Sequence, residues 1–519
     1  MSALFAATGL SLPQIDYTAI LPELIVLGGA LVLLGVAATV PRRIQSETYA
    51  ALTAGFGIAA LIAALFLWRD VTSHGPFLAV AGAIDADGFA AAGLVLSSSI
   101  VIVAAMLAPD YLRRAGHEGC EYYALALISA AGAMFMASAN DLILIFLALE
   151  ILSIPLYVMA AFDARRAASG EAGMKYFVLG AFSSAIFVYG IALTYGGTGS
   201  TNLADIATFL ARNVVSHNGV LLGGLALLLV GFGFKVAAVP FHMWTPDVYD
   251  GAPTPAVGFM AAIAKVGAFT ALLRVLIAAE PSLRGSYQPV LWVIVAASVL
   301  LGATVAIAQR NVKRMLAYSS INHAGFILLG VQAATARGVA ASVYYLFVYA
   351  FMVLGSFAVV GLVGDDGTEG GNDLEAFRGL GRRSPVVGVS FAILLLAQAG
   401  APFTTGFFAK FYVIEAAAEA HSYALAVVAM ASAAIAAFFY LRVVFVMFGE
   451  PASVEASAPL RGGGGGVALA TETVAVRIER VSASIWVLSG LGICVATTVV
   501  FGVWPQPILD FAHQATLLF

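Results

Sequence analysis

Long apolar runs constrain the fold of this chain more than any other feature. A helix needs about 20 apolar residues to cross roughly 30 Å of hydrocarbon, and fourteen stretches approach or exceed that length. They are 17–40, 49–68, 88–108, 121–139, 141–162, 172–195, 220–245, 253–279, 288–308, 315–335, 338–363, 385–414, 421–448 and 484–504. Hydrophobic residues make up 61% of 519 and charged residues only 10%, which excludes an ordinary soluble domain. The sequence predicts an all-α polytopic membrane protein with about 14 transmembrane helices in the lipid bilayer.

Positive charges are distributed unevenly between these runs. The loops after odd-numbered runs carry fifteen Lys and Arg residues, and the loops after even-numbered runs carry four. Loops rich in Lys and Arg remain in the cytoplasm, so we expect both termini on the periplasmic side. The first twenty residues contain no Lys or Arg, and no cleavable signal peptide is expected.

The remaining six cations lie inside apolar runs. They are Lys175, Lys235, Lys265, Arg274, Lys410 and Arg442. Four of the five lysines are therefore intramembrane, against two of twenty arginines. A buried lysine can lose its proton, whereas an arginine essentially cannot. This preference is what a proton relay through the membrane would require.

A helix break accompanies the first of the central lysines. Pro240 follows Lys235 by five residues and must interrupt the helix, because it lacks a backbone donor and crowds the preceding turn. An interrupted backbone is tolerated in a membrane only where protein or trapped water satisfies it, so the run 220–245 should line an internal polar route. His242 follows the break, and a hydrogen bond to freed carbonyls is favoured over proton carriage.

A second break, at Gly400 and Pro402, precedes Lys410 in the run 385–414. Paired interrupted helices indicate inverted repeats around a midplane ion site. We expect two inverted five-helix repeats, each containing a broken helix. The predicted units are N-terminal helices in 1–120, repeats in 121–280 and 281–450, and a cytoplasmic loop with the last helix in 451–519.

Glu150 is interpreted as the one acid well inside an apolar run, about 13 Å along its helix from Asp141 at 1.5 Å per residue. Its expected partner is Lys235, either as a static ion pair or as a switch that opens and closes.

The other intramembrane groups have alternative roles. For Lys265 a relay role is favoured over a structural one. Lys175 is near a loop, so snorkelling and function stay open. Arg274 and Arg442 are expected to snorkel from the ends of their runs. His323 could shuttle protons or bond a neighbouring helix.

Redox and nucleotide chemistry have no evident site on this chain. Cys120 and Cys494 are the only cysteines, too few for an iron–sulfur cluster or a zinc site. The glycine-rich segment 196–200 lacks the lysine of a phosphate-binding loop and is read as a turn. No metal, cofactor or nucleic acid is expected to bind this chain.

Three segments resemble the antiporter-like subunits of respiratory complex I. They are FHMWTPDVYDGAPTP with the following AAIAKVGAF (241–269), QRNVKRMLAYSSINHAGF (309–326) and LEAFRGLGRRSP (374–385). The resemblance covers roughly residues 120 to 450. The acidic segment 364–373 and the Gly462–Gly466 run depart from the family pattern and are read as cytoplasmic loop variation.

The resemblance implies roles for individual residues. Glu150 and Lys235 match the family's input ion pair, with Lys175 as a modulating charge. Lys265 matches the central relay lysine, and Lys410 matches the terminal group at the periplasmic exit. Sibling subunits with a glutamate at that last position, or with a long C-terminal lateral helix, are disfavoured.

The resemblance also implies partners and a location. FMN, iron–sulfur clusters and quinone are expected on partner subunits, namely other complex I membrane subunits and the peripheral redox arm. The expected location is the bacterial inner membrane. A subunit of a multi-subunit Na⁺/H⁺ antiporter remains the alternative, and a non-conducting scaffold is disfavoured by the intramembrane lysines.

Overall fold

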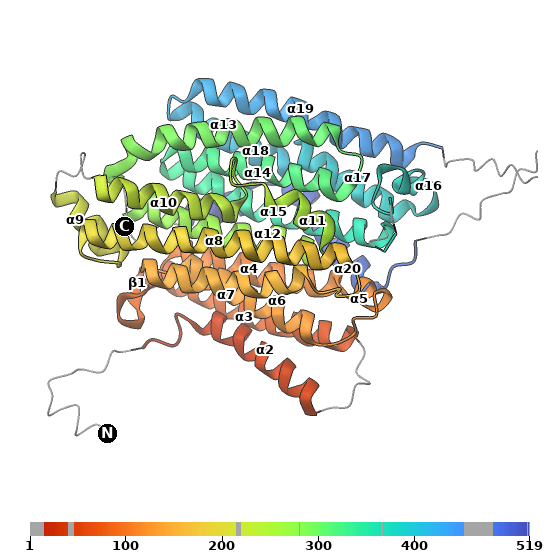
Figure 1. Cartoon of the computed structure of the whole chain (residues 1–519), viewed down its shortest axis with the longest axis horizontal. Helices are drawn as coiled ribbons and strands as arrows, with labels where there is room; N and C mark the ends of the chain where they lie inside the picture. Colours follow the sequence, from red (N-terminus) through yellow and green to blue (C-terminus); the bar gives the residue numbers. More distant parts are fainter. Residues whose placement is uncertain are drawn as a thin grey trace, which may run out of the picture.

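The computed structural model describes residues 15–39, 46–213, 219–279, 281–364, 367–368, 370–450, 481–515 and 517. Most of its long helices run in nearly the same direction (Figure 1). The N-terminal half contains α2 (Leu21–Thr39), α3 (Ser46–His74), α4 (Gly88–Leu107), α5 (Pro109–Arg114), α6 (Glu121–Ser138), α7 (Leu142–Ala160), α8 (Ala167–Thr198), α9 (Leu203–Arg212), α10 (Gly219–Val236), α11 (Trp244–Gly251) and α12 (Thr254–Leu273).

The second half continues the bundle. It contains α13 (Arg284–Ala308), α14 (Val312–Ala333), α15 (Ala336–Val363), α16 (Leu380–Arg383), α17 (Pro385–Ala399), α18 (Thr405–Glu419), α19 (Tyr423–Phe448), α20 (Ile485–Val503) and α21 (Gln506–Gln514). Short 3-10 turns lie at Val80–Gly82, Pro281–Leu283 and Leu374–Phe377, and a π-helical turn at Arg274–Ala279 follows α12. Polar caps start several helices because their side chains satisfy free backbone N–H groups; Asp141 does so for α7 and Asn311 for α14.

Eleven helices in the described residues are long and apolar enough to cross a membrane. They occupy eleven of the fourteen predicted runs, and the prediction of an all-α membrane protein is confirmed. The other three predicted runs contain α6, α14 and the pair α17 and α18. The predicted helix 220–245 is shorter than expected, because α10 ends at Val236.

A small β-hairpin was not anticipated by the helix pattern. Strands β1 (Phe77–Ala79) and β2 (Ile84–Ala86) pair antiparallel between α3 and α4, and Ile84 also bridges to Ala139 after α6. Asn140 and Asn202 both donate side-chain hydrogen bonds to the Gly82 carbonyl, each at 3.0 Å. The hairpin thus joins three chain segments at one end of the bundle.

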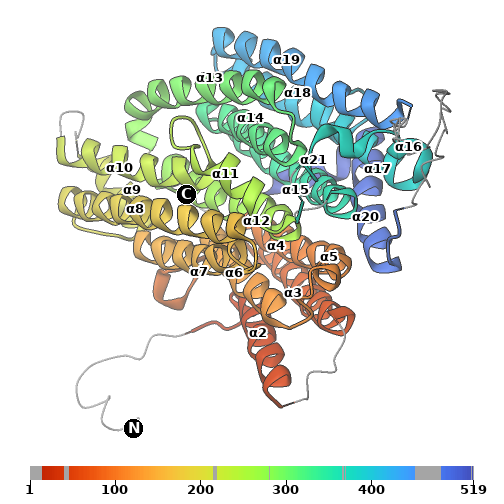
Figure 2. The same cartoon turned by 45° about the vertical axis from the view of Figure 1, so that its right-hand side comes forward.

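The helices α12 and α15 form the centre of the molecule (Figure 2). Of the apolar 18-residue stretch in each helix, all residues of α12 and 83% of those of α15 are buried. In α2, α8 and α20 the buried share is only 33%. Exposed aromatic residues such as Phe182 and Phe445 lie on the outer helices. Any charged side chain on α12 must therefore be satisfied inside the protein.

Candidate functional site

The first break exposes one backbone carbonyl to a lysine. Pro240 lies in the turn 237–243 between α10 and α11, and it lacks the N–H that would bond the Val236 carbonyl four residues earlier in a continued helix. Lys265 on α12 donates its Nζ to that carbonyl at 3.0 Å and is only 3% exposed. The negative end of the α10 dipole also favours a cation there. The break therefore creates the binding position of Lys265.

Lys235 lies in the last turn of α10, 3% exposed. Its Nζ lies 5.5 Å from the ring centre of Tyr157 and 5.4 Å from that of Tyr176, within the range of a cation–π contact. Among the described residues the Nζ has no hydrogen-bond partner. This ammonium is thus held by aromatic faces and is available to a mobile partner.

Glu150, the expected partner of Lys235, is bound elsewhere. Ser184 on α8 donates a 2.5 Å hydrogen bond to Glu150 Oε1. No ion pair joins Glu150 to Lys235 in the part of the chain that is described, although the two groups are near enough to interact electrostatically. A cavity of about 10 Å³ is lined by Ser184, Tyr157 and Lys235, close to the space that one water molecule needs.

The second break has the same chemistry as the first. The helix α17 ends at Ala399, Gly400 adopts a left-handed φ of +92°, and Pro402 lies before α18 begins. Lys410, on α18 and 5% exposed, donates its Nζ to the Ala399 carbonyl at 2.8 Å. Each broken helix therefore ends in a carbonyl that accepts a hydrogen bond from a buried lysine.

His323 lies between these two lysines. Its ring contacts the hydroxyl groups of Tyr345 at 2.7 Å and Tyr440 at 3.1 Å, and it is 1% exposed. Both Lys265 and Lys410 are near enough to act on it electrostatically. The imidazole thus bonds hydroxyl groups on α15 and α19, and these contacts fit an interhelical bond as well as proton shuttling.

Aromatic rings continue the contact on each side of His323. Tyr349 packs against the imidazole at 5.1 Å and against Lys265 Nζ at 5.8 Å. Lys410 Nζ lies 5.2 Å from the Phe326 ring centre. Lys265, His323 and Lys410 therefore all lie against aromatic side chains in the interior of the protein.

Lys175 lies apart from these groups, at the mouth of a charged cavity of 300 Å³. It pairs with Glu171 at 2.7 Å and with Asp247 at 2.9 Å, and Arg314 also reaches Asp247 at 3.0 Å. Hydrogen bonding to Lys175 lowers the pKa of Asp247 from its ordinary value. The structure does not bring Lys175 into contact with Glu150, so a modulating role would act through Asp247.

His242 occupies the same turn as Pro240. It is half-buried, and its ring interacts with the Pro240 carbonyl while Nδ1 has no hydrogen-bond partner in the described chain. This placement fits the expectation of a bond to the unwound backbone. Nothing in the contacts connects the ring with Lys265.

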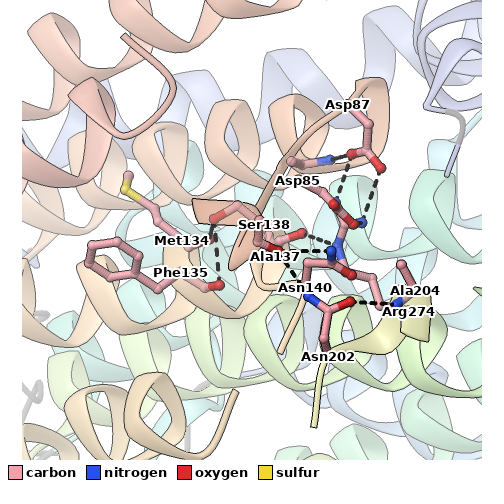
Figure 3. Close-up of polar contacts among 12 residues, drawn as sticks. Asp85, Asp87, Met134, Phe135, Ala137, Ser138, Asn140, Asn202, Ala204 and Arg274 are labelled. Atoms are coloured by element: carbon pink, nitrogen blue, oxygen red, sulfur yellow. Dashed lines mark hydrogen bonds and ion pairs between the residues drawn. The ribbon is translucent and has the colours of Figure 1, made fainter. Parts of the chain in front are cut away.

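The prediction that Arg274 snorkels is wrong. Its side chain is 1% exposed and forms ion pairs with Asp85 at 2.9 Å and Asp87 at 2.7 Å (Figure 3). The two acids lie about 190 positions earlier, in and after the hairpin, so no local pattern could reveal the pair. Arg442 is half-buried and donates to the carbonyls of Ile307 and Gln309.

Another buried acid, besides Asp85 and Asp87, was also missed. Glu23, in the first turn of α2, is 0% exposed and accepts a hydrogen bond from Ser138 at 3.2 Å. Its place six residues inside the run 17–40 was the available signal; because it lies in the first turn of α2, the interpretation of Glu150 as the one acid well inside an apolar run stays a prediction. Lys313 is fully buried as well and donates to the Ala252 carbonyl at 2.7 Å.

The described residues can be compared with the side-chain groups that bind metal ions. No group of three or more His, Cys, Asp and Glu side chains is gathered there. Cys120 and Cys494 are free, buried thiols. The Gly462–Gly466 run lies outside the described residues.

Comparison with known proteins gives consistent matches. Residues 139–436 match the family described as NADH:quinone oxidoreductase/Mrp antiporter, transmembrane. NADH-quinone oxidoreductase subunit N of Mycobacterium tuberculosis is 40% identical, covering 98% of this chain and 99% of the relative. A chain of respiratory complex I from Thermus thermophilus with bound aureothin is 32% identical with a TM-score of 0.76, covering 94% of this chain and 98% of its own length. A chain of the Mrp complex from Dietzia shares the fold at 21% identity, with a TM-score of 0.79 and coverage of 95% and 97%.

Proposed function

The chain belongs to the NADH:quinone oxidoreductase/Mrp antiporter family as a subunit N of NADH-quinone oxidoreductase, and from this membership we propose that it moves protons through Glu150, Lys235, Lys265, His323 and Lys410. Quinone reduction in partner subunits supplies the energy. The chain provides the route across the membrane, and FMN, iron–sulfur clusters and quinone are bound by its partners in the complex.

One observation carries the proposal. Each broken helix ends in a carbonyl that binds a buried lysine, Lys265 at Val236 and Lys410 at Ala399, with His323 between the two lysines. A neutral carbonyl can hold a lysine in either protonation state, whereas a carboxylate would fix the charged form. Groups held in this way can take up and release protons in turn.

The first step is closure of the pair between Glu150 and Lys235. When Glu150 leaves Ser184 and approaches Lys235, an ion pair at 4 Å is worth about 4 kcal/mol at an effective dielectric constant of 20. Moving a unit charge against about 100 mV requires roughly 2.3 kcal/mol. The free-energy change on closing this one pair is therefore large enough to move a proton from Lys235 towards Lys265, and quinone reduction drives the pair through its cycle.

The arrangement in the membrane follows from the same proposal. Fourteen spans result if α6, α14 and the pair α17 and α18 cross the bilayer with the eleven apolar helices. The repeats then comprise 121–280 and 281–450, each with one broken helix. Protons enter from the cytoplasm near Lys175 and leave near Lys410 on the periplasmic side, where both termini lie.

The alternative, a subunit of a Na⁺/H⁺ antiporter, has weaker support. The Dietzia chain shares the fold at 21% identity, whereas curated subunit N relatives are 40% identical over nearly the whole chain. Transport by the isolated membrane subunits without NADH would favour this alternative.

Replacement of Lys235 tests the proposal most directly. Lys235→Met removes the ammonium and Lys235→Arg keeps a charge that cannot be released, so both variants should abolish NADH-driven proton pumping. The assay is acidification of liposomes that contain the purified complex, with subunit content checked by mass spectrometry. Lys313→Met is the matched control, because it removes a buried lysine outside the relay. Normal pumping by assembled complexes carrying either Lys235 variant would overturn the scheme.

A further inference from the structure

A group of buried charges lies at the hairpin end of the bundle, outside the proposed relay. Asp85 lies in strand β2 of the hairpin, Asp87 precedes α4, and Arg274 is the first residue of the π-helical turn after α12. All three are at most 1% exposed, and Figure 3 shows the two carboxylates meeting the guanidinium. Single π turns inside helices are frequent at functional sites.

The contacts distinguish the two acids. Asp87 receives Arg274 Nη2 at 2.7 Å and Nη1 at 3.0 Å, and it caps α4 by accepting from the Ala90 N–H at 2.7 Å. Asp85 receives only Arg274 Nη1, at 2.9 Å on Oδ2. Its other oxygen, Oδ1, is buried and has no hydrogen-bond partner among the residues that the structure describes.

The charges in this group do not balance. One guanidinium neutralises one carboxylate, and the second would remain as a buried negative charge, which is costly without a partner. Further acids lie on neighbouring segments: Glu23 accepts a hydrogen bond from Ser138, Asp141 accepts one from Thr201, and Asp205 is exposed on α9. They supply no second cation. A proton on Asp85 would restore neutrality.

The position of the group relates it to the relay. Arg274 follows Lys265 by nine residues on one helical segment, which is about 13 Å at 1.5 Å per residue. The hairpin and the segment after α6 belong to loops that carry few positive charges, which places them on the periplasmic side. The group therefore lies between Lys265 and the outer surface.

We propose that Asp85 is a proton-binding group on the outer side of Lys265, loaded and emptied during pumping, with Arg274 and Asp87 as its fixed frame. This inference rests on the proposed function, because the relay through Lys265 is the source of the proton, and Asp85 is then a branch from Lys265 beside the exit proposed near Lys410. The proton is bound at Oδ1, and its release breaks only that O–H bond and leaves a carboxylate paired with Arg274. Burial raises the pKa of Asp85 to about 7 and Asp87 adds to this effect, while Arg274 opposes it.

The test uses Asp85→Asn in the whole complex reconstituted in liposomes. The amide oxygen still accepts from Arg274, so the frame is kept, but no proton can be bound or released. We expect protons pumped per NADH to fall at least about tenfold, as for loss of a positioned proton-transfer group. We also expect loss of the pH dependence that wild type shows within about one unit of the Asp85 pKa of about 7. Wild-type pumping with an unchanged pH profile would overturn the inference.

Matched variants separate the possible failures. Asp205→Asn changes an exposed acid near the same end and should pump like wild type. If Lys265→Met pumps normally, the proposed function fails. If Lys265→Met is inactive and Asp85→Asn is normal, only this inference fails. Should Asp85→Asn not assemble, Asp85→Glu keeps an acid there and should shift the pH profile of pumping, and an unshifted profile would contradict the inference.

Discussion

Removal of the Arg274 side chain gives the sharpest test of the packing. Arg274→Met keeps the length of the side chain but leaves Asp85, Asp87 and the Ala137 carbonyl, which accepts from Nε at 2.6 Å, without the guanidinium. Breaking a buried ion pair costs about 3–5 kcal/mol. Protonation of Asp85 relieves part of this cost, so a loss near the lower end of that range is expected.

Thermal release of this subunit from the purified complex measures the loss. Arg274→Met should lower the transition by several degrees and reduce the yield of assembled complex. The triple variant with Asp85→Asn and Asp87→Asn should recover part of it, because the uncompensated buried charges are gone. A single variant as stable as wild type would refute the reasoning and return Arg274 to a snorkelling role.

Three other expectations concern the relay and its mouth. Ser184→Ala removes the hydrogen bond to Glu150, which is worth about 1 kcal/mol. The rate of proton pumping at limiting NADH should therefore change severalfold, while assembly is unchanged. His323→Gln can still form hydrogen bonds with its tyrosine neighbours but cannot carry a proton. Acidification of liposomes should therefore fall strongly, while assembly of the complex stays normal. The pKa of Asp247 is lowered in the folded protein. Its contribution to stability is therefore present above its ordinary pKa of 3.8 and is lost as the pH falls through the lowered value. Lys175→Met should weaken that contribution, as measured by thermal unfolding above about pH 4.

The broken helices were predictable because their cause is local. Pro240 removes a donor wherever it stands in a helix, and Pro402 does the same in the run 385–414. A lysine within reach of each break completed the pattern. What the sequence could not supply was the acceptor: that Lys265 binds the carbonyl of Val236, on another helix, depends on how α10 and α12 pack.

Pairings between distant segments were less predictable. Glu150 was expected to pair with Lys235, but in the structure it accepts a hydrogen bond from Ser184, which lies on a third helix. Arg274 was misread because its partners lie in a hairpin of three-residue strands, too short to produce an alternating pattern. His323 had two equal interpretations in the sequence, and its partners Tyr345 and Tyr440, on two other helices, could not be identified from it.

The segment from Lys265 to Arg274 shows why the chain uses two kinds of cation. Among the described residues, the hydrogen-bond acceptor at Lys265 is a neutral carbonyl, so loss of the proton leaves no carboxylate there uncompensated. At Arg274 two carboxylates converge, and a cation that lost its proton there would leave both charges unpaired, at a cost of several kcal/mol. Arginine keeps its proton and offers a planar fork of donors, which suits the fixed frame, while lysine can change its charge. One helix therefore carries a group suited to move protons and, nine residues later, a group suited to hold the structure around them.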